Sequence, residues 1–186
     1  MTDAAYLSGR LLLAMPGMGD PRFDHAVIAM VQHDAEGALG VGVGRARDGV
    51  TLHAVLKDLE IDPGDLPDAP VLDGGPVEQQ RGFVLHSAEW QGRGTIEAGP
   101  FGAMTTSRDV LEAIAAGIGP QDYVVALGYA GWGAGQLDGE MRRHGWFAAR
   151  GNPDILFRTS PEERWRATWK AQGIDPAHLV GQTGRA

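Results

Sequence analysis

The residues best suited to acid–base chemistry lie in the stretch 81–87, which ends on His86 and Ser87. His86 is the one histidine whose neighbours, Arg81 and Ser87, could join it in proton transfer, so it is the candidate general base. Adjacent strand residues point to opposite faces, which excludes a simple nucleophile–base pair between His86 and Ser87. The competing interpretation is a structural histidine whose ring bonds to the backbone.

A stiff turn lies a few residues upstream of this stretch. Gly74 and Gly75 precede Pro76, whose ring fixes its own φ and restricts the residue before it. A rigid glycine turn beside a strand end that carries a histidine is a candidate binding loop. We therefore predict that Gly74, Gly75 and Pro76 contact a ligand.

A predicted helix start at residues 106–108 offers a second place for an anion. Thr106, Ser107 and Arg108 supply two hydroxyls and a cation where free N–H groups favour phosphate or carboxylate. The alternative is that Thr106 caps the helix and that Arg108 is solvated.

A glycine- and aromatic-rich loop is expected at 128–135, before a helix that begins at Gln136. The free N–H groups of that helix start suit an anion or a polarised carbonyl. Tyr129 and Trp132 are predicted to form a flat, partly apolar wall beside it. The alternative is that both rings cover the core while the glycines permit tight packing.

Several other chemistries are excluded. The chain has no cysteine, which removes disulfides, iron–sulfur clusters, thiolate zinc sites and thiol nucleophiles. It has no phosphate loop, no GxSxG or HExxH motif, and the glycines of 128–133 are in the wrong order for a dinucleotide fingerprint. The six histidines lack metal-ligand spacing. We therefore predict no metal site and no cofactor.

The charge balance bears on partners and location. Sixteen basic residues against 24 acidic ones give a net charge of −8, which argues against nucleic acid and anionic membranes. The first residues lack a signal peptide's basic region, and the longest uncharged run, 123–137, is too short and glycine-rich to span a bilayer. We expect a cytoplasmic protein, monomeric or weakly homo-oligomeric.

The elements that must position these residues mix strands and helices without strict alternation. The length predicts a single domain over 1–186, with a core of about 6–174 and short flexible ends. Alternating glycines at 40, 42 and 44 leave one strand face bare, so another segment must pack against that backbone. The pattern favours a mixed, mostly antiparallel sheet with helices around it. Strands are predicted at 11–15, 25–32, 38–44, 82–87, 95–98, 101–104, 123–127 and 146–149, helices at 51–60, 106–116, 136–144 and 160–173, and a polar loop, the best candidate for a mobile segment, at 63–70.

Five segments occur in a fixed order, at 14–23, 74–77, 81–87, 105–111 and 128–137. They resemble the AlgH/YqgE family of bacterial proteins, and the resemblance covers residues 11–174. It implies an α+β domain whose bifurcated sheet folds into a pseudo-barrel with helices outside, and it implies no assigned reaction, cofactor or catalytic residues. It also suggests a link to transcriptional regulation. One departure is visible, because Gly44-Arg45-Ala46 stands where the family usually has Asn-Arg-Pro.

Three functions follow from these observations. The first is a cytosolic binding or regulatory module for a small anionic ligand or a partner protein. The second is a metal-independent hydrolase or transferase with His86 as general base and Arg81 or Arg108 holding an oxyanion. Direct DNA binding ranks last on charge. The first two predict that His86, Thr106 and Trp132 surround one shared pocket.

Overall fold

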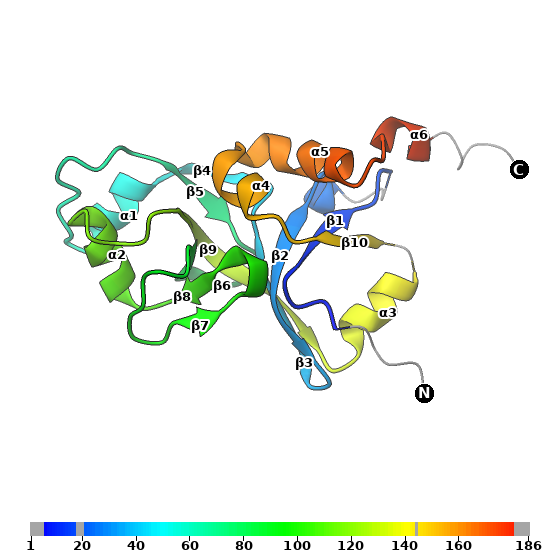
Figure 1. Cartoon of the computed structure of the whole chain (residues 1–186), viewed down its shortest axis with the longest axis horizontal. Helices are drawn as coiled ribbons and strands as arrows, with labels where there is room; N and C mark the ends of the chain where they lie inside the picture. The colour runs from blue at the N-terminus through cyan, green and yellow to red at the C-terminus, as the bar shows by residue number, and fades with distance from the viewer. Residues whose placement is uncertain (1–5, 18–20, 144, 181–186) are drawn as a thin grey trace, which may run out of the picture.

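A computed structural model describes residues 6–17, 21–143 and 145–180. Within these ranges ten strands form a mixed sheet that divides along one long strand, β9 (Tyr123–Gly133). The first half of β9 belongs to one prong of the fork and the second half to the other (Figure 1). The two prongs curl away from each other, so the sheet forms a half-barrel instead of one flat layer.

The first prong contains β1 (Arg10–Ala14), β2 (Val27–Asp34), β3 (Gly37–Gly42) and β10 (Trp146–Arg150). Its order is β10-β1-β2-β3-β9, and every pair in it is antiparallel. The predicted strands at 11–15, 25–32, 38–44 and 146–149 are thereby confirmed, with ends shifted by up to two residues.

The second prong holds the remaining strands, with β9 paired to β6 and β5. The β5 strand runs parallel to β9, whereas β6 and β8 are antiparallel to their neighbours. The mixed, mostly antiparallel sheet predicted from the sequence is confirmed. These strands are β4 (Ala46–Thr51), β5 (Pro70–Asp73), β6 (Val77–His86), β7 (Ile96–Glu97) and β8 (Ala103–Thr105).

Helices lie on the outside of the fork (Figure 1). The helices α1 and α2 lie beside the second prong. The helix α3 follows the end of β9, and α4, α5 and α6 lie along the top of the view. The long α5 confirms the helix predicted at 160–173 and buries Trp165 and Trp169 one turn apart. The helices are α1 (Leu52–Asp58), α2 (Arg108–Ala115), α3 (Gln136–Arg142), α4 (Pro153–Arg158), α5 (Pro161–Ala171) and α6 (Pro176–Val180), with short 3-10 turns η1 (Pro21–Phe23) and η2 (Gly99–Phe101).

The largest hydrophobic cluster joins both prongs. Leu11 and Val27 of the first prong pack in the same cluster as Phe83 and Ala126 of the second, and Trp169 of α5 completes it. That the whole chain forms a single domain stays a prediction. None of the described helices is long and apolar enough to cross a membrane.

Glycines allow the prongs to cross at close range. A Cβ on Gly74 would overlap the backbone of Gly128, and one on Gly75 would overlap that of Tyr129. Gly42 is blocked in the same way by the carbonyl of Asp73. The bare face of β3 therefore packs against another backbone, as its alternating glycines predict.

Several local predictions were wrong. The loop expected at 128–135 is mostly the second half of β9, because Ala130–Gly133 pair with β3. The N-cap of α2 is Ser107, not Thr106, and β4, β5 and α4 were missed. The predicted end of the helix at 136–144 and the outermost chain ends lie outside the described residues.

Candidate functional site

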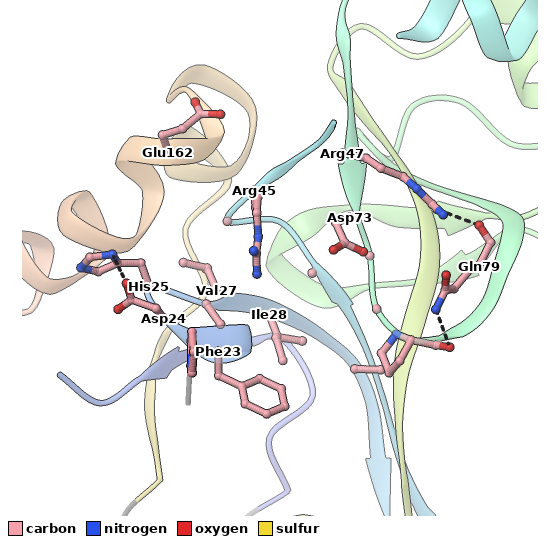
Figure 2. A pocket seen from close by; sticks show the side chains of 18 residues that line it. Phe23, Asp24, His25, Val27, Ile28, Arg45, Arg47, Asp73, Gln79 and Glu162 are labelled. Carbon is pink, nitrogen blue, oxygen red and sulfur yellow. Dashed lines mark hydrogen bonds and ion pairs between the residues drawn. The ribbon is translucent and has the colours of Figure 1, made fainter. Parts of the chain in front are cut away.

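A pocket opens where the two prongs separate (Figure 2). Its volume is about 620 Å³, within the range of small-molecule sites. It receives residues from both prongs and from α5. The described lining is Pro21, Phe23, Asp24, His25, Ala26, Val27, Ile28, Gly42, Gly44, Arg45, Arg47, Asp73, Gly74, Gly75, Pro76, Gln79, Ala130 and Glu162.

One wall carries two arginines. Arg45 and Arg47 alternate with Ala46 where β4 begins, so both side chains reach the pocket. Arg47 donates from Nη1 to the carbonyl of Gln79 at 2.8 Å, and Gln79 in turn donates to the carbonyl of Pro76 at 3.3 Å. The backbone around Arg45 is fixed, because its carbonyl accepts from the Asp73 N–H at 3.0 Å.

The facing side carries acidic groups and a histidine. Asp24 lies 3.6 Å from Nδ1 of His25, and the His25 ring meets Trp165 edge-on at 4.3 Å between centroids. His25 has φ of 55°, a left-handed conformation that histidine adopts more readily than most residues. Glu162 adds a carboxylate from the first turn of α5. In Figure 2, Arg45 lies between the Asp24–His25 pair and Asp73.

Arg164 ties α5 to the connection that carries Arg45. The residue is 4% exposed, and its guanidinium donates from Nη1 to the carbonyl of Val43 at 2.7 Å. Burial lowers its pKa to about 10, an effect that the nearby charge of Glu162 opposes, so the group stays cationic at neutral pH. Its Nε–H has no hydrogen-bond partner among the described residues.

Binding groups dominate the chemistry of this pocket. Among the described lining residues there is no hydroxyl, thiol or amine side chain to act as a nucleophile. Guanidinium groups bind carboxylate or phosphate through paired N–H donors, and carboxylates bind ammonium groups. Elsewhere in the described chain, no three histidine, aspartate or glutamate side chains gather as a metal site.

Of the sequence-predicted site residues, Gly74, Gly75 and Pro76 line this pocket. They form the turn between β5 and β6, held by bonds from the Gly42 N–H to the Gly74 carbonyl and from the Gly74 N–H to the Leu127 carbonyl. Close backbone packing explains the two glycines without a ligand.

His86 lies in the second prong with its ring fully buried. Nδ1 lies 2.9 Å from the carbonyl of Ser87, and Nε2 lies 2.8 Å from Oγ1 of Thr105. Trp90 covers the ring edge-on at 5.5 Å. Because both nitrogens have partners, this geometry favours a structural histidine. A catalytic role for His86 stays a prediction.

Two of the candidate residues meet on the surface near this histidine. Arg81 donates to Thr106 Oγ1 at 3.3 Å and to Glu78 at 3.1 Å, and its guanidinium lies 5.5 Å from the Phe83 ring centroid. Arg108 pairs with Glu112 one turn along α2 at 2.6 Å. Ser107 donates to the carbonyl of Arg93 at 2.7 Å and to Asp109.

The aromatic candidates belong to two further groups. Tyr129 packs against Phe83 at 5.3 Å between ring centroids. Trp132 donates from Nε1 to Glu140 Oε2 at 3.0 Å, and Trp146 donates to the same oxygen at 3.1 Å. Gln136 accepts from the Gly133 N–H and donates to Oε1 of Glu140 at 3.3 Å.

The expectation of one shared pocket is therefore corrected. His86, Thr106 and Trp132 take part in separate bonding networks, and none of them lines the pocket at the fork. Sequence reasoning missed the charged lining groups at 24, 25, 45, 47 and 162. The one available signal was the pair of arginines two residues apart after the glycine strand, and it is too common a pattern to single out.

The fold and the pocket together define a class: an α+β protein whose sheet forks into a half-barrel, with a cleft at the fork. The model of the AlgH-like family, DUF179, matches residues 11–177. The chain belongs to this family.

Similar proteins share the full length of the chain. UPF0301 proteins of Novosphingobium aromaticivorans and Rhizorhabdus wittichii are 64% and 55% identical over 186 residues, which is all of this chain and of theirs. The solution structure of the AlgH protein from Pseudomonas aeruginosa has a TM-score of 0.78 at 41% identity, covering 100% of this chain and 99% of that one. A protein of Corynebacterium diphtheriae, 20% identical with a TM-score of 0.73 over 93% and 91%, shares the fold.

Proposed function

We propose that the chain is a binding protein that holds a small molecule in the pocket at the fork, with an anionic group against Arg45 and Arg47. The observation that carries the proposal is the pair of guanidinium groups on one wall of a cavity of about 620 Å³. Charge-assisted bonds from arginine are among the stronger contacts that a protein offers to carboxylate or phosphate. Arg164 of α5 lies outside the lining and bonds to the carbonyl of Val43, two residues before Arg45.

This proposal keeps the small anionic ligand predicted from the sequence but assigns its binding to different arginines. The small-anion ligand and the Gly74–Pro76 turn stay, whereas Arg45 and Arg47 take the place of Arg81 and Arg108. Neither Arg81 nor Arg108 is among the residues that line this pocket. Three other expectations stay predictions: that the ligand is a partner protein, that the protein is cytoplasmic, and that it is monomeric or weakly homo-oligomeric.

The test is a thermal-shift screen of carboxylates and phosphates on the full chain at low salt. A ligand at a hundred times its Kd stabilises a protein by about 2.7 kcal/mol, which raises Tm by roughly 5–11 °C at this chain length. We expect the double variant Arg45→Gln, Arg47→Gln to lose the shift, and Arg142→Gln, an exposed site outside the pocket, to keep it. Ligands that stabilise all three proteins equally, or no ligand at all, would refute the proposal.

The hydrolase or transferase alternative makes a different prediction in the same screen. A ligand bound through His86 would lose its shift in His86→Ala and keep it in the double arginine variant. Direct DNA binding remains the least favoured function, because the two lining arginines lie among three carboxylates, not along a basic strip.

A further inference from the structure

The charges of the fork pocket are not those of a simple anion site. Three carboxylates, from Asp24, Asp73 and Glu162, line it beside the guanidinium groups of Arg45 and Arg47. An inorganic anion that approached the arginines would therefore also meet the field of the carboxylates. The pocket presents both cationic and anionic side chains, and a ligand that fills it must be compatible with both.

The positions of these charges separate into two walls. Arg45, Arg47 and Asp73 come from the β3–β4 connection, β4 and the end of β5, so one carboxylate lies with two guanidinium groups. Asp24 and Glu162 come from the turn before β2 and from α5, and Figure 2 places them on the other side of Arg45. One wall has a surplus of positive charge and the other a surplus of negative charge.

The carboxylates have few partners of their own. Among the described residues, neither Asp24 nor Glu162 forms an ion pair with lysine or arginine. Asp24 lies 3.6 Å from Nδ1 of His25, and the two form an ion pair only when that ring is protonated. Glu162 acts on Arg164 through its charge, but Arg164 bonds to the carbonyl of Val43 instead.

A ligand in the pocket would displace part of the water around these exposed carboxylates. A carboxylate that loses water without gaining a donor costs free energy, so a purely anionic ligand would lose part of what the arginines contribute. An ammonium group supplies three donors and an opposite charge. The apolar side chains of Val27 and Ile28, on β2, and of Phe23, at the end of η1, also line the pocket, where they suit a hydrocarbon spacer.

This inference rests on the proposed function: we infer that the ligand is amphoteric, with an anionic group for Arg45 and Arg47 and an ammonium group for Asp24 and Glu162. The chemical class is a small amino acid-like molecule with separated charges. The cavity accommodates the whole of such a molecule, since small-molecule sites span about 300–1,000 Å³.

The test compares three probes of equal chain length, caproate, hexylamine and ε-aminocaproate, by titration of the backbone amides in an NMR spectrum. The amides of Ala26, Gly44 and Gly75 report on the two walls and the turn between them. We expect ε-aminocaproate to shift these amides at about one-tenth of the concentration that caproate needs, or less, and hexylamine to be weaker still.

Variants separate the two ends. Glu162→Gln and Asp24→Asn together should make ε-aminocaproate no better than caproate and leave caproate binding unchanged, whereas Glu163→Gln, the next residue and outside the pocket, should change neither. If wild type binds caproate and ε-aminocaproate equally, the amphoteric ligand is refuted and the anion site stands. If no probe shifts the pocket amides, both are refuted.

Discussion

The buried histidine supports a quantitative prediction, because its hydrogen bonds form a chain with one direction. Nδ1 of His86 faces a carbonyl, which can only accept, so Nδ1 carries the proton. With the proton on Nδ1, we expect Nε2 to accept from the Thr105 hydroxyl at 2.8 Å. Thr105 accepts from the Thr95 hydroxyl at 2.7 Å, and Thr95 accepts from the Gly92 N–H at 3.0 Å.

Replacing Thr105 with valine breaks this chain at its centre with little change of shape. Nε2 of His86 loses its donor in a fully buried place, and an unsatisfied buried group costs about 1–3 kcal/mol. The hydroxyl of Thr95 is only half-buried, so water replaces most of its lost bond. We expect Thr105→Val to lower the free energy of unfolding by about 2–3 kcal/mol, and Tm by roughly 4–12 °C.

Urea denaturation measures this loss, and the adjacent residue is the control. The hydroxyl of Thr106 is half-buried and accepts from the exposed Arg81, so Thr106→Val should cost less than about 1 kcal/mol. Nitrogen chemical shifts of His86 should in addition report a neutral ring protonated at Nδ1. Equal stabilities for the two valine variants, or a proton on Nε2, would contradict this direction of the hydrogen-bond chain.

Three shorter predictions concern other parts of the fork. Gly75→Ala should destabilise by more than about 3 kcal/mol in urea, because its Cβ would overlap the backbone of β9, while Gly82→Ala, with open space around it, should be close to neutral. Glu140→Gln replaces a carboxylate that receives two indole N–H groups, so it should cost about 1–3 kcal/mol and change the tryptophan fluorescence. Hydrogen bonds from the Ser107 side chain and from backbone N–H groups lower the pKa of Asp109, so its stabilisation is present above the unfolded pKa and lost as pH falls through the folded one. Urea midpoints between neutral pH and about pH 2 should accordingly fall less steeply in Asp109→Asn.

Apolar periodicity predicted the elements that bury a continuous face. The strand at 11–15 and the helix at 51–60 are examples, because local spacing decides which side chains reach the core. The second half of β9 escaped prediction for the opposite reason. Its glycines have weak strand propensity, and pairing with β3 across the fork overrides that local preference.

The site was harder to predict than the fold, because its groups converge from segments far apart in the sequence. Asp24, Arg45 and Glu162 are ordinary charged residues in their local context, and only the fork brings them to one cavity. His86 posed the reverse problem. Its neighbours in sequence suggested acid–base work, but the adjacent strand β8 supplies Thr105, which occupies the nitrogen that catalysis would need.

The glycine turn at 74–76 contributes both to the packing of the fold and to the pocket. Its glycines let the end of β5 press against Gly42 on one side and β9 on the other, which is a packing requirement. The same close approach brings Arg45 and Arg47, at the start of β4, to the edge of the first prong, where Asp24 lies. A side chain at Gly74 or Gly75 would push this turn away from β9, and one at Gly42 would push the prongs apart and separate those charges. Packing and binding therefore constrain the same residues, and a ligand that bridges the two walls should stabilise the crossing itself.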